Sequence, residues 1–259
     1  MYEWEKDLDI VREAVQGASA IAMRYFLQFP KDWWKKGGDS PVSSADIAVN
    51  DYLESFLRPL RPSYGWLSEE NDDDLHRLNC ETIFVVDPID GTRAFIAGKK
   101  EWCISVAVVH RGRPVVGVIY ASSVDKEFIV SIGMKSTCNG KQISVSSPAS
   151  GDCLMVMASD ALLKGLESDV LIEKNPCVSS LCLRLVMVAI GKIDVVLVQR
   201  NANDWDLAAA DLLLECAGGA LVNVNGQSLI YNRSQVNHDI LFASSKAHFA
   251  LFKQHLSTL

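Results

Sequence analysis

The sequence of 259 residues lacks several features, and each absence excludes a class of protein. No apolar run reaches the roughly 20 residues that a membrane-spanning helix needs, so we expect no such helix. The seven cysteines are scattered and form no C-x-x-C pair, which favours reduced thiols in the cytoplasm over a disulfide framework or a zinc site. Positive charge is scarce too. The 25 Lys and Arg against 32 Asp and Glu give a net charge of -7, which argues against a general nucleic-acid binder.

Internal repeats and low-complexity segments are also missing, and the acidic, amphipathic start MYEWEKDLDI does not resemble a signal peptide. With 49% hydrophobic and 22% charged residues, the composition is that of an ordinary globular protein. The chain is long for one domain and short for two independent ones. We therefore expect a single compact body with two lobes.

The first half of the sequence predicts helices followed by a β-meander. Apolar residues recur at helical spacing over residues 4–26, and residues 29–41 (FPKDWWKKGGDSP) then break the pattern and indicate a loop. Ser43 or Ser44 is the predicted cap of a second helix, which ends before Pro62. Four apolar segments then predict strands, with a hairpin between the second and the third: residues 82–87, 103–110, 114–121 and 126–132.

The second half alternates between strands and helices. The predicted elements are strands at 153–159, 192–198 and 238–245, a helix after the first of these strands, helices at 180–191 and 204–219, and a last helix near the end. The change of pattern near Ser147 indicates an α+β N-terminal lobe, residues 1–147, and an α/β C-terminal lobe, residues 148–259, that completes the site. The predicted fold class is α/β.

The segment Asp87–Thr92 (DPIDGT) has two interpretations. Asp, Pro and Gly are the residues of ordinary turns. Asp87, however, follows an apolar segment and should lie at the carboxyl end of a buried strand, where α/β folds bind their ligands. Pro88 fixes the chain direction, so the turn can aim the carboxylates of Asp87 and Asp90 and the carbonyl of Ile89 at one point. Oxygen ligands of this kind suit a hard cation, Mg²⁺ above all.

Gly91 and Thr92 add a predicted anion site next to that cation. If a short helix begins there, its first backbone amides point outward together and attract negative charge. Cation ligands and anion-binding amides in one short segment are what a phosphate ester and its metal need.

Other carboxylates have a structural interpretation beside the functional one. Glu69 and Glu70 are either a solvated pair or part of the site. Asp204 or Asp206 is a candidate N-cap of the helix predicted at 204–219, and a carboxylate at that position can cap the helix and bind a metal at once. Asp46 lies in the first turn of the second predicted helix, where an acid complements the helix dipole.

Together these segments resemble the inositol monophosphatase family of Mg²⁺-dependent, lithium-sensitive phosphatases. The resemblance rests on three motifs in the family's order: Glu69-Glu70, Asp87–Thr92, and Trp205-Asp206 followed by Glu215–Gly219. It covers essentially the whole chain. It implies a layered α-β-α-β-α sandwich, often a homodimer, with two or three Mg²⁺ ions and a small phosphorylated substrate.

The resemblance also implies a ligand set for two metal ions. Glu69, Asp87 and the carbonyl of Ile89 match the ligands of the first metal. Asp87, Asp90 and Asp206 match those of the second, so Asp87 is expected to bridge the two ions.

Further roles follow from the same resemblance. Gly91 and Thr92 match the phosphate-binding amides, and Glu69 and Thr92 match the residues that orient the attacking water. Asp46 matches a residue linked to a third, weakly bound ion. Lys36, otherwise a solvated loop lysine, matches a lysine usual near the site.

The substrate is less well defined by the sequence. Inositol-specific members usually have Asn where this chain has Ala94, and Gln199 stands about where they carry a glutamate that binds ring hydroxyls. Arg184 falls where bisphosphate nucleotidases tend to carry a lysine, and Arg200 comes shortly before the third motif. Either arginine suits a second phosphate or is an ordinary helix-end or surface charge.

We therefore expect a phosphomonoesterase for a small ester such as inositol monophosphate. The main alternative is a 3′(2′),5′-bisphosphate nucleotidase acting on adenosine 3′,5′-bisphosphate, and histidinol-phosphate phosphatase comes third. A regulatory binding protein with a vestigial site is the non-enzymatic alternative, since some family members act in transcription without turnover. The intact carboxylates argue against it, because clustered like charges without a use only reduce stability.

Overall fold

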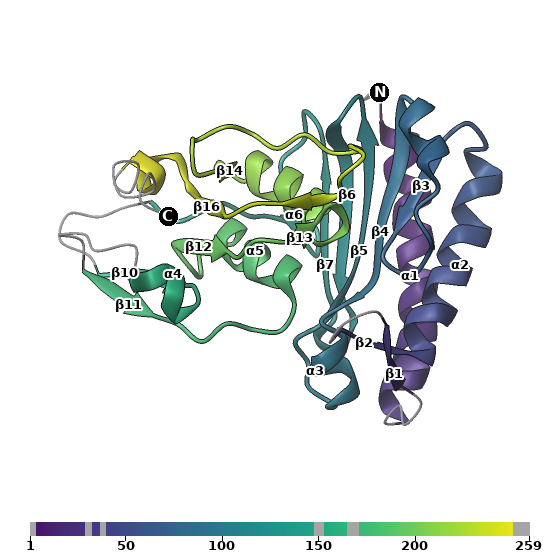
Figure 1. The fold of residues 1–259 in the computed structure, drawn as a ribbon, viewed down its shortest axis with the longest axis horizontal. Coiled ribbons are helices and arrows are strands. Elements are labelled where there is room, and N and C mark those ends of the chain that lie inside the picture. The colour runs from purple at the N-terminus through teal and green to yellow at the C-terminus, as the bar shows by residue number, and fades with distance from the viewer. Residues whose placement is uncertain (1–3, 29–32, 37–39, 148–152, 165–170, 251–259) are drawn as a thin grey trace.

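The computed structural model describes residues 4–28, 33–36, 40–147, 153–164 and 171–250. Across the molecule, Figure 1 shows a pair of helices, a large sheet, a second pair of helices and a smaller sheet. Apolar side chains of α4 (Asp160–Lys164) and of the helical residues 246–250 pack against the outer face of the smaller sheet. The predicted α-β-α-β-α sandwich is confirmed.

The first layer consists of α1 (Glu5–Leu27) and α2 (Ser44–Leu60), as the apolar spacing predicts. Their buried faces cover one face of the large sheet. Of the two candidate caps, Ser43 is the N-cap: its hydroxyl accepts the Ala45 N–H, and its own N–H donates to the Asp46 carboxylate at 2.8 Å. This capping box holds Asp46 in the first turn of α2.

The large sheet contains seven strands that lie side by side in chain order. They are β3 (Gly65–Ser68), β4 (Thr82–Asp90), β5 (Cys103–His110), β6 (Arg113–Ala121), β7 (Lys126–Ser131), β8 (Thr137–Cys138) and β9 (Lys141–Gln142). From β4 onward each strand is antiparallel to the next, which confirms the predicted meander. In β4, Phe84 and Val86 face α1 and α2, whereas Ile83 and Val85 face the opposite helical layer. Burial on both faces explains why the strand is apolar from Ile83 to Val86.

The strand β3 is a feature that the sequence analysis did not predict. It is short and runs parallel to β4, with Ser68 opposite Val86. The Glu69 N–H then donates to the Val86 carbonyl at 3.2 Å. The pairing therefore places Glu69 at the end of β3, next to the start of the Asp87–Thr92 segment.

The strand predicted to end at Asp87 continues to Asp90, so that prediction was wrong at its C-terminal end. The pairing with β5 shifts register between these two residues, as in a β-bulge. Pro88 has no N–H to donate to the ladder, and the strand accommodates it by bulging rather than by ending. The short helix α3 (Thr92–Ile96) follows.

The predicted loop at residues 29–41 is partly β-structure, which corrects the prediction. Trp33–Lys36 (β1) pairs antiparallel with Ser40–Ser43 (β2), while residues 29–32 and 37–39 lie outside the described residues. Aromatic residues favour strands, and here the two tryptophans outweigh the nearby glycines.

The smaller sheet has five strands in the order β11-β10-β12-β16-β14. They are β10 (Leu154–Met157), β11 (Ile172–Lys174), β12 (Val195–Val198), β14 (Gly219–Asn223) and β16 (Leu241–Ser245). The strands predicted at 153–159, 192–198 and 238–245 are confirmed, whereas β11 and β14 were not predicted. Beside this sheet, β13 (Ala202–Asn203) pairs with β15 (Asn237–His238). The last predicted helix is seen at residues 246–250, and residues 251–259 lie outside the described residues.

The middle layer consists of α5 (Leu181–Ala189) and α6 (Asp204–Cys216), buried between the two sheets. A Cβ at Gly117 of β6 would lie 2.9 Å from the Ala209 carbonyl oxygen, so this glycine permits the close approach of α6. A helix from the second half of the chain thus covers the sheet of the first half. The lobe boundary near Ser147 stays a prediction. None of the helices in the described residues is both long and apolar enough to cross a membrane.

Candidate metal and phosphate site

A cavity of about 360 Å³ lies where β4, the start of α3 and the N-terminal ends of α5 and α6 meet. Its lining comes from both halves of the chain: Pro41, Glu69, Asp87, Ile89, Asp90, Gly91, Thr92, Arg93, Cys177, Val178, Ser179, Arg184 and Asp206. All predicted ligands and both predicted phosphate-binding residues lie in this lining. Positions that are distant in sequence are therefore brought together.

Three carboxylates are close enough to share a cation. One oxygen each from Asp87, Asp90 and Asp206 lies within 4.8 Å of the others. Asp87 and Asp90 come from the bulged end of β4, and Asp206 comes from the first turn of α6. The bulge explains how two acids separated by two residues can face the same cavity.

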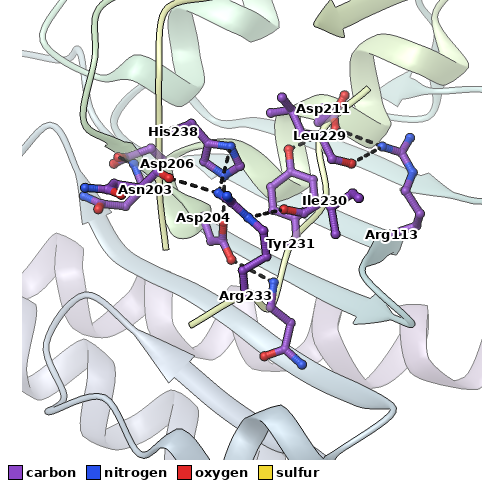
Figure 2. Close-up of polar contacts among 12 residues, drawn as sticks. Arg113, Asn203, Asp204, Asp206, Asp211, Leu229, Ile230, Tyr231, Arg233 and His238 are labelled. Carbon is purple, nitrogen blue, oxygen red and sulfur yellow. Dashed lines mark hydrogen bonds and ion pairs between the residues drawn. The ribbon is translucent and has the colours of Figure 1, made fainter. Parts of the chain in front are cut away.

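Asp206 owes its position to the cap of α6. The N-cap is Asn203, which corrects the prediction that Asp204 or Asp206 occupies that position. The Asn203 N–H donates to Asp206 Oδ2 at 2.7 Å (Figure 2). One oxygen of Asp206 thus holds the start of the helix, and the other remains for the cavity.

Asp204 has a different, structural role. It is fully buried and accepts hydrogen bonds from His238 Nε2 at 2.7 Å and from the Asn232 N–H at 2.9 Å. Figure 2 shows Asp204 between His238 and this backbone segment. The Arg233 guanidinium lies 3.4 Å from His238 Nδ1. Because that nitrogen faces a donor, the histidine proton is assigned to Nε2, which donates to Asp204.

The four carboxyl groups of the cavity resist ionisation in the protein alone. Burial is the largest cause that raises the pKa of Glu69, Asp87, Asp90 and Asp206, and it brings the pKa of Asp206 to about 7. Like charges add to it: Asp206 raises the pKa of Glu69, and Glu69 raises that of Asp87. Nearby positive charge is what such a group needs in order to stay ionised at neutral pH.

The side chains fit a hard divalent cation. Asp87 Oδ1 is buried and has no hydrogen-bond partner among the described residues. A buried carboxylate oxygen left without a partner is costly unless a cation satisfies it. The cluster of Asp87, Asp90 and Asp206 offers only oxygen, which suits Mg²⁺.

Thr92 connects this site to Asp46. Its hydroxyl lies 3.0 Å from Asp46 Oδ1 and 3.0 Å from the Ile89 carbonyl oxygen. Asp46 is buried, and burial raises its pKa to about 6, although hydrogen bonds from Ser43 and Thr92 oppose the rise. Asp46 is thus joined to the cavity through Thr92 rather than by lining it.

The backbone conformation and the crowding at position 91 both require glycine. Its φ of 98° lies in the left-handed region that favours glycine. A Cβ there would also lie 2.7 Å from the Glu101 carbonyl oxygen. Only glycine therefore lets the chain turn from β4 into α3 with Thr92 as the first helical residue.

Of the three predicted substrate residues, only Arg184 is among the described residues that line the cavity. Arg184 lines the cavity, and its Nε donates to the Val178 carbonyl at 2.6 Å. Gln199 is exposed, and neither it nor Arg200 is among the described residues that line this cavity. Arg200 pairs with Asp239 at 2.8 Å and lines a separate cavity of about 600 Å³. The predicted role of Gln199 and Arg200 in substrate binding stays a prediction.

Of the two remaining candidates, only Glu70 has a described side chain, and it is not among the described residues that line the cavity. Lys36 is the last residue of β1, and its side chain lies outside the described part of the structure. Glu70 is partly buried, and its charge contributes to the raised pKa of Glu69 and of Asp46.

Sequence reasoning missed several lining residues. Arg93 directly follows the Asp87–Thr92 motif, and this position in the sequence could have identified it as a site residue. Cys177, Val178 and Ser179 lie in an irregular segment before α5 and match no motif that points to the site.

Comparison with known proteins establishes the family. The sequence profile described as the inositol monophosphatase family matches residues 3–258. The chain belongs to the inositol monophosphatase family. Because this is a family of metal-dependent phosphatases, the resemblance drawn from the three motifs and the predicted enzyme class, a phosphoric monoester hydrolase, are confirmed.

Relatives within the family carry two kinds of name. The 3′(2′),5′-bisphosphate nucleotidase CysQ of Escherichia coli (strain K12) is 30% identical over 231 residues, covering 86% of this chain and 93% of that protein. Inositol monophosphatase 3 of Solanum lycopersicum is 28% identical over 237 residues, covering 86% and 87%. Among solved structures, the extragenic suppressor protein suhB from Bartonella henselae superposes with a TM-score of 0.85 at 23% identity, covering 97% and 98%. That likeness shows the shared fold.

Proposed function

We propose that this family member is a Mg²⁺-dependent phosphomonoesterase that hydrolyses a small phosphate ester such as inositol monophosphate. The single observation that carries the proposal is the cavity in which Asp87, Asp90 and Asp206 converge, with one buried oxygen of Asp87 unpartnered among the described residues. The acids are arranged for a cation, and Gly91 and Thr92 lie in the same lining for the phosphate.

The residues that would hold the metal follow from this arrangement. Glu69, Asp87 and the Ile89 carbonyl would bind one Mg²⁺, and Asp87, Asp90 and Asp206 a second, with a third ion linked to Asp46. When bound, Mg²⁺ lowers the pKa of its water and neutralises charge on the phosphoryl group. Lithium inhibition is part of the proposal, as the family resemblance implies.

The protein's own groups position the reactants. Thr92, with its hydroxyl 3.0 Å from Asp46 Oδ1, and Glu69 would orient the attacking water. The N–H groups of Gly91 and Thr92 would bind phosphate oxygens, and the φ of 98° at Gly91 fixes the direction of that turn. Most of the catalysis then comes from positioning and electrostatics, as expected for phosphoryl transfer.

A second candidate, 3′(2′),5′-bisphosphate nucleotidase activity on adenosine 3′,5′-bisphosphate, is favoured by one specific observation. Arg184 lines the cavity, and its guanidinium is held by the Val178 and Ser179 carbonyls; an arginine at this place suits a second phosphate. The relatives named CysQ support the same candidate. Histidinol phosphate remains the third substrate, and a non-enzymatic regulatory role is the alternative to turnover.

The cellular setting is also a proposal. All seven cysteines lie in the described residues and are free thiols, which supports a reducing, cytoplasmic location. The net charge of -7 supports a small phosphorylated substrate rather than nucleic acid as the partner. A homodimer is expected from the family resemblance.

One experiment tests the function directly. The purified protein is incubated with inositol monophosphate, adenosine 3′,5′-bisphosphate or histidinol phosphate, and released phosphate is measured with and without Mg²⁺ and Li⁺. We expect Mg²⁺-dependent, Li⁺-inhibited release from at least one ester, and the relative kcat/KM values rank the substrates. Absence of release from all three, in a folded protein, would favour the binding role.

A further inference from the structure

The carboxylate of Asp90 is held by the start of α5. Asp90 Oδ2 accepts the Ser180 hydroxyl at 2.5 Å and the Cys182 N–H at 2.6 Å. Asp90 Oδ1 has only a longer contact, 3.2 Å, with the Leu181 nitrogen. Ser180 lies 90 residues after Asp90, so these bonds join the end of β4 to a helix from the other half of the chain.

The Ser180 hydroxyl lies between Asp90, the start of α5 and Cys103. Ser180 is the N-cap of α5, and its oxygen accepts the Leu183 N–H at 2.9 Å. The Cys103 sulfur lies 3.5 Å from the same oxygen. A hydroxyl offers one hydrogen and two lone pairs. Since the Leu183 N–H only donates and an ionised Asp90 only accepts, the serine hydrogen goes to Asp90, and a second lone pair faces the Cys103 sulfur.

Ser180 also lies against the predicted phosphate-binding turn. A Cβ added to Gly91 would be 3.2 Å from the Ser180 Cβ, so the two segments are in van der Waals contact. Ser180 is fully buried and is not among the described residues that line the cavity. Any effect of its hydroxyl on the site is therefore transmitted through Asp90.

We propose that Ser180 is a positioning residue for the metal site. Its hydroxyl holds Asp90 Oδ2 against α5 and thereby presents Asp90 Oδ1 to the cation shared with Asp87 and Asp206. The inference rests on the proposed function, since it requires that cation.

The test measures metal binding itself. Mn²⁺ is the probe, and its affinity for each purified full-length protein is determined by electron paramagnetic resonance. The central variant is Ser180→Ala, and Ser180→Thr keeps the hydroxyl. Ser159→Ala is the matched control, because the Ser159 hydroxyl lies 3.4 Å from the Leu162 nitrogen at the start of α4 and belongs to neither the cavity nor its carboxylates.

We expect Ser180→Ala to weaken Mn²⁺ binding by about 10- to 100-fold, the usual effect of removing a group that orients a metal ligand. The Mg²⁺ concentration for half-maximal activity should rise by a similar factor. Ser180→Thr should restore most of the affinity, and Ser159→Ala should bind Mn²⁺ like the wild type. Because both alanine variants lose a helix-start contact, a change in thermal stability does not distinguish them, whereas Mn²⁺ affinity does.

Two results would overturn the inference, and they are distinguishable. Wild-type Mn²⁺ affinity in Ser180→Ala, in a protein whose wild type binds Mn²⁺ and releases phosphate, overturns the role of Ser180 alone. A wild type that binds no Mn²⁺ and releases no phosphate overturns the proposed function as well. If Ser180→Ala does not fold, Ser180→Gly serves as the test, since glycine is well tolerated at an N-cap.

Discussion

The hydroxyl of Thr92 lies 3.0 Å from Asp46 Oδ1, although the two residues are 46 positions apart in the chain. The same hydroxyl is 3.0 Å from the Ile89 carbonyl oxygen, and with one hydrogen it can donate to only one of these acceptors at a time. When it donates to Asp46, its lone pairs are free to accept a hydrogen bond from the attacking water. The Thr92 hydroxyl can thus accept a hydrogen bond from water, while the Asp46 carboxylate fixes the direction of that hydroxyl.

Thr92→Ala should therefore lower kcat by roughly 10²- to 10⁴-fold, the range for loss of a group that handles the reacting proton. Thr92→Ser keeps the hydroxyl and should retain most of the activity. Steady-state kinetics at saturating Mg²⁺ measure both. Near-native kcat in Thr92→Ala would show that the hydroxyl does not act on the water.

Asp87→Asn should abolish phosphate release and leave the fold intact, because Asp87 is expected to bridge two cations. Without metal, burial and the neighbouring acids already raise the pKa of Asp87 and favour its neutral form, so a neutral Asn costs little there and in EDTA the melting temperature should not fall. Circular dichroism and a phosphate-release assay measure the two effects. The control is Asp72→Asn at an exposed position, which should behave like the wild type. An unfolded Asp87→Asn, or one with native turnover, would contradict the assignment.

Gly91→Ala should lose both stability and activity, and Gly140→Ala should lose only a little stability. Both glycines have positive φ, 98° and 75°, so each alanine pays roughly 1–2 kcal/mol for the left-handed conformation. At Gly140 nothing lies within 4 Å of an added Cβ, whereas at Gly91 the Glu101 carbonyl oxygen would be 2.7 Å away. Urea denaturation and kcat measure the difference. Equal losses in the two variants would rule out a special role for the Gly91 turn.

Asp211→Asn should change how stability depends on pH. Asp211 is buried in α6 and accepts the Tyr231 hydroxyl at 2.9 Å, and burial raises its pKa to about 7 (Figure 2). An unfolded Asp has a pKa near about 3.9. Between these values the folded protein holds a proton that the unfolded chain releases, so this contribution to stability is complete below the lower pKa and is lost as the pH rises through the upper one.

The free energy of unfolding of Asp211→Asn should accordingly fall less steeply between these two pKa values than that of the wild type. Urea denaturation at a series of pH values, with saturating Mg²⁺ to keep the site carboxylates ionised, measures both curves. Asp72→Asn again serves as the control. Parallel curves for wild type and Asp211→Asn would mean that Asp211 is ionised throughout.

Arg184→Ala should raise KM more for a substrate with two phosphates than for a substrate with one. If Arg184 contacts a second phosphate, KM for adenosine 3′,5′-bisphosphate should rise by about 10-fold or more, the effect of losing a charge-assisted hydrogen-bonded pair. KM for inositol monophosphate should change much less. Arg184→Lys keeps the charge but not the bidentate geometry and should lie between the two. Equal changes for both esters would remove the support that Arg184 gives to the nucleotidase candidate.

The sequence predicted best what is local. Asp87, Asp90, Gly91 and Thr92 are adjacent in the chain, so a strand end and a turn suffice to place them together, even though β4 runs further than expected. Asp206 was found because a carboxylate at a helix start has a recognisable pattern. The contact between Ser180 and Asp90 has no local pattern, since it depends on how α5 packs against the first sheet.

Arg200 shows that closeness in sequence does not guarantee closeness in the structure. It is close in sequence to Asp206, but Asn201, with a φ of 72°, turns the chain between them, and Arg200 instead pairs with Asp239. Nearness along the chain does not fix direction where the backbone enters the left-handed region. The strand β11 was missed because three residues are too short a run for a clear periodic signal. The start of β14, Gly219, was assigned to the helix predicted at 204–219.

The position of α6 has a consequence for synthesis on the ribosome. A nascent chain that has exposed only the first sheet still lacks the helix that covers Val85 and Ala107, and it lacks Asp206. Such an intermediate has a bare apolar surface and an incomplete set of acids. We therefore expect a metal to bind at this site only after α6 has joined the two sheets.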